Sequence, residues 1–255
     1  MKFNSIKNAL LVSALLAGGA IVPAYAAAPS DTTVVLVHGA FADGSSWERV
    51  IPLLQAKGLK VVAVQNPLTS LADDVAATKR VIDAQTGKVV LVGHSWGGTV
   101  ITEAGTDDKV KALVYVAAFA PNEGEATATQ GKDYPVPPGI ATLQADKAGY
   151  LSLPDASVAA NFAQDMSAAD ARLIAATQGP INSKAFGETT TVAAWKNKPN
   201  YYIVAAKDRM IDPNLERAYA AKLHAATTTL ATSHVPMVSQ PKQVAEVILA
   251  AVARQ

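Results

Sequence analysis

The sequence predicts an α/β fold in which a mostly parallel β-sheet is covered by helices on both faces. Short β-branched runs are apolar at every position, which is typical of strands buried on both sides of a sheet. These runs alternate with helical patterns along the chain, and such alternation produces parallel strands joined by crossover helices. The 255 residues, 50% of them hydrophobic, are enough for one large domain with a sizeable core.

Six apolar runs are the predicted strands, and helices are predicted between them. The strands lie at Thr33–Val37, Val61–Val64, Val89–Val92, Ala112–Val116, Tyr201–Ala205 and Thr227–Leu230. The helices lie at Trp47–Lys57, Leu71–Gln85, Pro213 to about Ala225, and Pro241–Val252, with another that begins near Trp96. Gly58 is a plausible C-terminal cap of the first helix, and Pro213 suits a first turn.

The alternation stops at Pro121 and resumes near Pro199. The interval holds proline-rich and glycine-rich breakers and two helical patches, Ser157–Met166 and Ala168–Gln178, and it is too long for a plain loop. We therefore expect a helical cap at about 122–198, inserted over the carboxyl edge of the sheet, where open parallel sheets bind ligands.

The first residues read as a secretory signal peptide at 1–26. Two lysines precede an apolar run that is too short to span a bilayer comfortably, and Ala24-Tyr25-Ala26 matches a cleavage site. An uncleaved membrane anchor is the alternative. Residues 27–255 would then form a single domain without a membrane anchor. The chain has no cysteine, which excludes disulfides and a thiol nucleophile. A periplasmic or secreted protein is expected.

The charge balance and the motifs argue against several classes of partner. With 22 Lys+Arg against 21 Asp+Glu, nothing favours binding to nucleic acid or an anionic membrane. The four histidines are scattered, so no metal site is predicted. No glycine-rich dinucleotide turn follows the first strand, and no cofactor is expected.

The stretch VVLVGHSWGG places Ser95 between a predicted strand and a predicted helix. This is the G-x-S-x-G nucleophile elbow, in which a strained turn exposes the hydroxyl at the sheet edge. Side chains at Gly93 and Gly97 would collide across the turn, and Gly98 lets the helix approach the sheet. Ser95 is therefore the candidate nucleophile.

A serine nucleophile needs a base, and His234 is the candidate because it follows the last strand. His38 is expected to pack or hydrogen-bond, His94 to point away from Ser95, and His224 to be solvated. Asp208 ends the stretch YYIVAAKD, which contains the strand Tyr201–Ala205, and it lies between Ser95 and His234 in the sequence. It is therefore the candidate acid, which would hold the imidazole in the required tautomer.

Asp212 is the alternative acid, although its position directly before Pro213 is more typical of a helix N-cap. The expected oxyanion donors are the backbone amides of Trp96 and Ala40, with Phe41 as a substitute for Ala40. Four aromatic side chains are expected to line a pocket under the cap: Phe41, Trp96, Phe119 and Phe162.

Together these motifs resemble the alpha/beta-hydrolase superfamily, and more closely its cap-bearing branch of plant methyl esterases, hydroxynitrile lyases and bacterial esterases. The stretches VLVHGAFADGSSWERVIPLLQAKGLKVVAV, LVGHSWGG, KVKALVYVAAFAP, KDRMIDP and SHVPMVSQPKQVAEVI carry the likeness. It implies Ser95, Asp208 and His234 as the triad and the Ala40 and Trp96 amides as the oxyanion hole.

Departures from the family narrow the chemistry. The related lyases have a lysine after the catalytic histidine and a threonine in the first loop, where this chain has Val235 and Gly39. Haloalkane dehalogenases have an aspartate where this chain has Ser95. The stretch PLTSLADD, residues 67–74, also departs from the usual glycine-containing loop, and its role is left open.

The expected activity is hydrolysis of a small carboxylic ester through an acyl-enzyme, with the small-molecule ester as the partner. Lactone or amide hydrolysis, perhydrolysis and carbon–carbon cleavage are alternatives, because the fold hosts them all. A non-catalytic small-molecule binder is the third possibility.

Overall fold

The computed structural model describes residue 1 and residues 31–255. The predicted signal peptide therefore lies, apart from Met1, outside the described residues. Within residues 31–255, no helix has both the length and the apolar character that crossing a bilayer requires.

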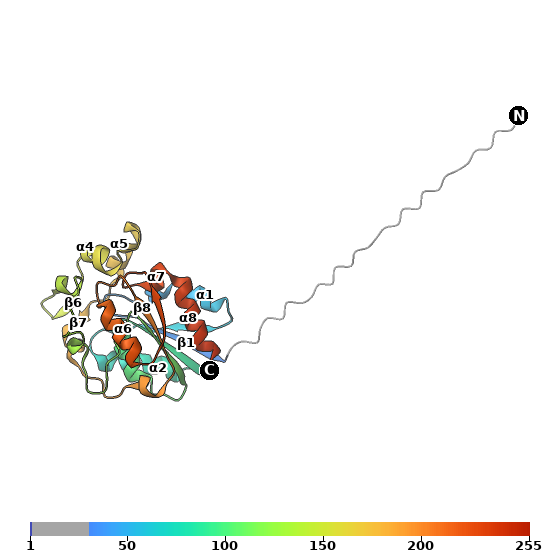
Figure 1. The fold of residues 1–255 in the computed structure, drawn as a ribbon, viewed down its shortest axis with the longest axis horizontal. Helices are drawn as coiled ribbons and strands as arrows, with labels where there is room; N and C mark the ends of the chain where they lie inside the picture. Colours follow the sequence, from blue (N-terminus) through green and yellow to red (C-terminus); the bar gives the residue numbers. More distant parts are fainter. Residues whose placement is uncertain (2–30) are drawn as a thin grey trace.

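A six-stranded parallel sheet forms the centre of the fold, in the order β2-β1-β3-β4-β8-β9 (Figure 1). All six predicted strands are confirmed, each within two residues of its expected ends. They are β1 Thr32–Val37, β2 Lys60–Ala63, β3 Lys88–His94, β4 Val110–Val116, β8 Asn200–Ala205 and β9 Ala226–Leu230. Most side chains of β1, β3 and β4 are fully buried, as their uninterrupted apolar sequences require.

The strand order reverses direction between β1 and β3. The chain runs from β1 to its neighbour β2 on one side, and then crosses to β3 on the other side of β1. Loops leaving β1 and β3 therefore diverge at their carboxyl ends, and such a switch point is where open parallel sheets place ligands.

Helices cover both faces of this sheet, with α1 and α8 on one side and α2 and α6 on the other (Figure 1). Within residues 31–255, the α-helices outside the β4–β8 interval are α1 Ile51–Gln55, α2 Leu71–Asp83, α3 Trp96–Ala104, α6 Pro213–Lys222, α7 Pro236–Ser239 and α8 Pro241–Ala253.

The prediction of a helix at Trp47–Lys57 is wrong for the first half of that segment. Gly44–Trp47 forms a short 3-10 turn, and α1 begins only at Ile51. Pro52 explains the late start, because a proline has no N–H to donate and fits only the first turn of a helix. Gly58 adopts a positive φ of 77° just after this helix, as expected for a glycine that ends one.

Between β4 and β8 the chain extends beyond the end of the sheet (Figure 1). The helix expected at Ala168–Gln178 is α5, Ala168–Thr177. The helix expected at Ser157–Met166 is instead the short α4, Asp155–Ser157, and a π-helical turn, Val158–Phe162. The interval also holds an antiparallel sheet, which the prediction of a helical cap did not include. Its strands are β5 Gln144–Ala145, β6 Tyr150–Ser152 and β7 Ile181–Asn182, which are too short for a periodic signal.

Candidate active site

Ser95 occupies the sharp turn between β3 and α3. It has φ 53° and ψ −119°, a conformation that side-chain-bearing residues rarely adopt. A Cβ atom at Gly93 would lie 2.5 Å from the carbonyl oxygen of Gly97, and one at Gly97 would lie 2.6 Å from that of Val37. The turn can therefore form only with glycine at both positions, as predicted.

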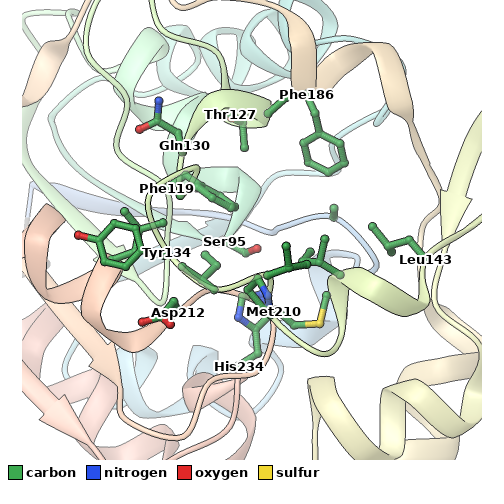
Figure 2. A pocket seen from close by; sticks show the side chains of 18 of the residues that line it. Ser95, Phe119, Thr127, Gln130, Tyr134, Leu143, Phe186, Met210, Asp212 and His234 are labelled. Atoms are coloured by element: carbon green, nitrogen blue, oxygen red, sulfur yellow. The ribbon is translucent and has the colours of Figure 1, made fainter.

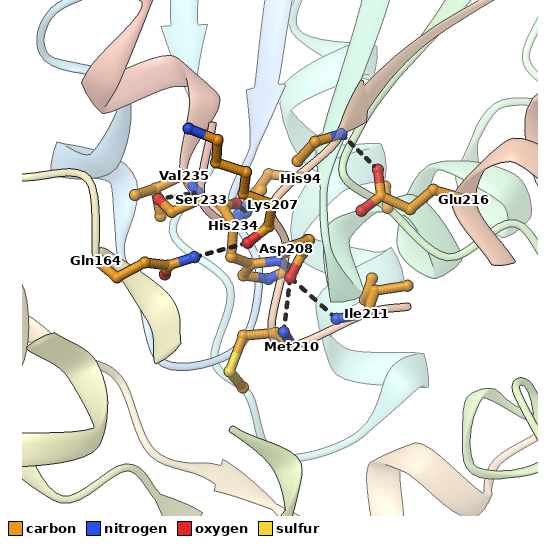
Figure 3. A network of polar contacts seen from close by, with 12 residues as sticks. His94, Gln164, Lys207, Asp208, Met210, Ile211, Glu216, Ser233, His234 and Val235 are labelled. Carbon is orange, nitrogen blue, oxygen red and sulfur yellow. Dashed lines mark hydrogen bonds and ion pairs between the residues drawn. The ribbon is translucent and has the colours of Figure 1, made fainter. Parts of the chain in front are cut away.

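Asp208 and His234 form a buried pair at the carboxyl edge of the sheet (Figure 3). The imidazole Nδ1 of His234 lies 2.6 Å from Oδ2 of Asp208. The other carboxylate oxygen, Oδ1, accepts hydrogen bonds from the backbone amides of Met210, at 2.6 Å, and Ile211, at 3.0 Å. Both oxygens are thus engaged, which restrains the orientation of the carboxylate beside the imidazole.

Asp212 has a different partner. Its carboxylate accepts a hydrogen bond from the backbone amide of Asn214 at 2.7 Å and so caps the N-terminus of α6. Of the two candidate acids, only Asp208 is hydrogen-bonded to His234.

Ser95 and His234 line the same cavity of about 360 Å³, and Figure 2 shows the serine hydroxyl directed into it between Phe119 and His234. The wall is mainly apolar and includes Phe41, Phe119, Ile140, Leu143, Phe186 and Leu215. Two of the expected pocket residues, Phe41 and Phe119, therefore lie in the wall.

Phe162 and the Trp96 side chain do not line this cavity, contrary to expectation. The Phe162 ring is buried against the imidazole of His234, with ring centroids 5.1 Å apart at 64°. The indole of Trp96 is buried and donates from Nε1 to Oδ2 of Asp74 at 2.7 Å. Both rings thus pack behind the site, because the elements that carry them turn these side chains into the core.

The loop after β1 touches the nucleophile. A Cβ atom at Gly39 would lie 2.7 Å from Cβ of Ser95, so only glycine permits this approach. His38 holds the loop: its Nδ1 donates to the carbonyl oxygen of Gly39 at 2.8 Å, and its Nε2 accepts from the amide of Asn66 at 2.9 Å. Burial lowers the pKa of His38, so the imidazole is neutral, as these two bonds require.

The candidate oxyanion donors differ in how they are engaged. The amide of Phe41 donates to the carbonyl oxygen of Gly179 at 3.1 Å and is therefore occupied. Among the described residues, no hydrogen bond occupies the amides of Ala40 or Trp96. Trp96 is the first residue of α3, where backbone amides have no intrahelical acceptor and favour developing negative charge.

His94 is a residue of the site that the sequence did not identify. Its Nε2 donates to the backbone carbonyl oxygen of His234 at 2.8 Å, and the two rings have centroids 4.7 Å apart. Burial lowers the pKa of His94 well below its usual value, which keeps the ring neutral. No local signal could have revealed this contact, because it joins positions 140 residues apart.

Among residues 31–255, no group of three or more His, Cys, Asp and Glu side chains is arranged to hold a metal ion. The arrangement offers a hydroxyl, an imidazole oriented by a carboxylate, and two free amides, one in the loop after β1 and one at the N-terminus of α3, which together suit nucleophilic attack on an acyl carbon.

Several known proteins resemble this chain, and of three examples two do so over most of its length and one over about a third of it. The sequence model of the alpha/beta hydrolase family matches residues 34–247. A probable hydrolase, R7, of a Phoma species is 28% identical over 84% of this chain and 96% of that protein. Methylesterase 2 of Arabidopsis thaliana is 35% identical over 34% of this chain and 40% of that protein. The crystal structure of a pyrethroid hydrolase from Sphingobium faniae has a TM-score of 0.75 and 22% identity, over 87% of this chain and 97% of that one.

Proposed function

The chain belongs to the alpha/beta hydrolase family, and from that premise we propose that it is a serine esterase acting on small carboxylic esters. One observation carries the proposal: the buried pair of Asp208 and His234, with 2.6 Å between their side-chain atoms, opens onto the cavity that also exposes Ser95. A carboxylate that orients an imidazole beside a strained serine is the arrangement that makes a hydroxyl nucleophilic.

In the proposed reaction, Ser95 Oγ attacks the ester carbonyl carbon while His234 Nε2 takes the hydroxyl proton. Asp208 accepts the hydrogen bond from Nδ1 and stabilises the imidazolium that forms. The amides of Ala40 and Trp96 bind the oxyanion of the tetrahedral intermediate. His234 then passes the proton to the leaving alcohol, and a water molecule, deprotonated by the same imidazole, hydrolyses the acyl-enzyme.

The cavity wall favours a substrate with an apolar acyl or alcohol group. Aromatic and aliphatic side chains supply most of the wall, and burial of apolar substrate surface there contributes about 25 cal/mol per Å². The partial similarity to a plant methylesterase supports an ester as the reacting group.

The proposal is tested with p-nitrophenyl esters of increasing chain length, wild-type protein and Ser95→Ala. We expect turnover by the wild type, and a loss of at least about 10⁴-fold in kcat for Ser95→Ala, because members of a triad act as a unit. Covalent labelling of Ser95 by an organophosphonate should accompany turnover. Substantial activity of Ser95→Ala would contradict the mechanism, and binding without labelling would indicate a non-catalytic binder.

We further propose that residues 1–26 are a signal peptide and that the protein is exported. The charged start, the short apolar run and the Ala24-Tyr25-Ala26 pattern support this assignment. Expression of the full chain in a bacterial host, followed by N-terminal sequencing of the periplasmic and medium fractions, should give a chain that begins at Ala27. Recovery of the uncut chain in the membrane fraction would instead support an anchor.

A further inference from the structure

Asp74, in the stretch PLTSLADD, is a buried carboxylate that the proposed reaction does not use. It lies in the first turn of α2 with 0% of its surface exposed. Its two oxygens have different partners: Oδ2 accepts from the indole Nε1 of Trp96 at 2.7 Å, and Oδ1 accepts from the backbone amide of Leu68 at 2.8 Å. A carboxylate is rarely fully buried without a reason, because the loss of hydration is costly.

The bond from Oδ2 reaches the helix that carries the first proposed oxyanion donor. Trp96 follows Ser95, and its backbone amide is that donor. The indole is fully buried, and its ring packs edge-on against Phe186 in the cavity wall, with ring centroids 5.3 Å apart. A bond that fixes the indole therefore also restrains the backbone of the residue whose amide is the proposed donor.

The bond from Oδ1 leads to the second proposed donor. Leu68 has a positive φ of 59°, which a non-glycine residue adopts only when its surroundings enforce it. A Cβ atom at Gly179 would lie 2.8 Å from the Leu68 side chain, so the two residues are closely packed. The carbonyl oxygen of Gly179 accepts the amide of Phe41, the residue after Ala40.

We propose that Asp74 is a positioning residue for the oxyanion hole, which it holds together by bonding Trp96 on one side and Leu68 on the other. The inference rests on the proposed esterase function and assigns a role to the stretch PLTSLADD. Asp74 does not touch the substrate, since it is absent from the cavity wall, and it acts through the residues that carry the two donor amides.

The electrostatic surroundings agree with a carboxylate held by donors rather than by a cation. Burial, and to a smaller extent the nearby carboxylates of Asp73 and Glu188, raise the pKa of Asp74, while the hydrogen bonds from Trp96 and Leu68 lower it, and the net pKa is about 6. The two hydrogen bonds therefore favour the ionised carboxylate of Asp74, and loss of either bond would favour the protonated form.

The test compares Asp74→Asn with Asp73→Asn, a matched control on the neighbouring, exposed carboxylate of the same helix. An asparagine oxygen can accept only where one carboxylate oxygen did, and its amide group would face a second donor. We expect kcat/KM for a p-nitrophenyl ester to fall about 10- to 100-fold in Asp74→Asn, with KM nearly unchanged. Asp73→Asn should remain within twofold of wild type.

A second readout separates positioning from a general loss of structure. A trifluoromethyl ketone forms a tetrahedral oxyanion on the serine, so its inhibition constant reports the oxyanion hole. In Asp74→Asn the inhibition constant should increase by the same factor by which kcat/KM falls. The turnover rates are normalised to the concentration of active sites, which an organophosphonate titrates. Trp96→Phe removes the indole donor and keeps an aromatic ring, so adding Asp74→Asn to it should cost less than Asp74→Asn costs in the wild type, because only the bond to Leu68 is left to lose. If Asp74→Asn does not fold, Trp96→Phe should still lower kcat/KM and inhibitor affinity together, because it breaks one of the two bonds of Asp74.

Unchanged kcat/KM in Asp74→Asn, an equal loss in Asp73→Asn, or a loss confined to KM would each overturn the positioning role while leaving the esterase function intact. A wild-type protein that turns over no ester would overturn the esterase function, and the positioning role with it.

Discussion

The imidazole Nε2 of His94 donates a hydrogen bond to the backbone carbonyl oxygen of His234, with 2.8 Å between the two atoms. The residue that precedes the proposed nucleophile therefore holds the loop that carries the proposed base. The ring is neutral because burial lowers its pKa well below the usual value, and its single proton must lie on Nε2, since a carbonyl oxygen can only accept.

His94→Asn should lower kcat about 10- to 100-fold and leave KM for a p-nitrophenyl ester nearly unchanged. The shorter side chain removes the bond to the His234 loop, and misplacement of a base by a fraction of an ångström is costly. His224→Asn is the control, because His224 is exposed and has a positive φ of 47°, which asparagine tolerates. Steady-state kinetics on both variants, normalised by active-site titration, give the comparison; equal kinetics for the two would exclude a role for His94.

Asp208→Asn and Asp212→Asn should separate the roles of the two carboxylates in the stretch KDRMIDP. We expect Asp208→Asn to lose about 10⁴-fold in kcat, because an amide in contact with Nδ1 favours the wrong imidazole tautomer. Asp212→Asn should keep both activity and stability, since asparagine caps a helix as well as aspartate does. Ester turnover and thermal unfolding measure both, and a severe loss in Asp212→Asn alone would transfer the acid role to that residue.

The sheet and the local features of the site could be predicted because each has a signal within a few neighbouring residues. The six strands are runs of apolar residues, and the turn at Ser95 depends on glycines two positions away on either side. The contacts of His94, Asp74 and Phe162 could not be predicted, because each joins segments that are distant in the sequence. Local patterns place a residue on an element, but the packing of elements decides what its side chain meets.

Gly39→Ala should impair catalysis without abolishing the fold. The added Cβ would lie 2.7 Å from Cβ of Ser95, so the loop that carries the Ala40 amide must move away from the nucleophile. Loss of one oxyanion donor typically costs about 10²- to 10³-fold in kcat, and we expect a decrease in that range. The control is Gly58→Ala, where no atom lies within 4 Å of the new Cβ and only the positive φ of 77° is unfavourable.

Gly58→Ala should therefore lower the free energy of unfolding by about 1 kcal/mol and leave kcat unchanged. Circular dichroism melts and ester turnover distinguish the two variants. A Gly39→Ala protein with wild-type kcat would show that the loop after β1 does not contribute to the oxyanion hole.

Glu216 should make the stability of the protein depend on pH. Its carboxyl group is 0% exposed, and Oε2 accepts a hydrogen bond from the backbone amide of Ala205 at 2.8 Å (Figure 3). Burial, and then the neighbouring Asp208 carboxylate, raise the pKa of Glu216 well above its ordinary value of 4.5. The group is therefore protonated in the folded protein at pH values where the unfolded chain has released that proton.

The sign follows from this difference in bound protons. Below pH 4.5 both states are protonated and the contribution of Glu216 is fully present, whereas above it the folded state binds more protons and stability falls with rising pH, until the folded group itself ionises. Glu216→Gln has no proton to lose, so its free energy of unfolding relative to wild type should increase from pH 5 to pH 8, by up to about 1.4 kcal/mol per pH unit. Urea unfolding at several pH values measures this difference. Glu246→Gln, at an exposed glutamate of α8, should run parallel to wild type, and a parallel course for Glu216→Gln as well would mean that Glu216 is ionised in the folded protein.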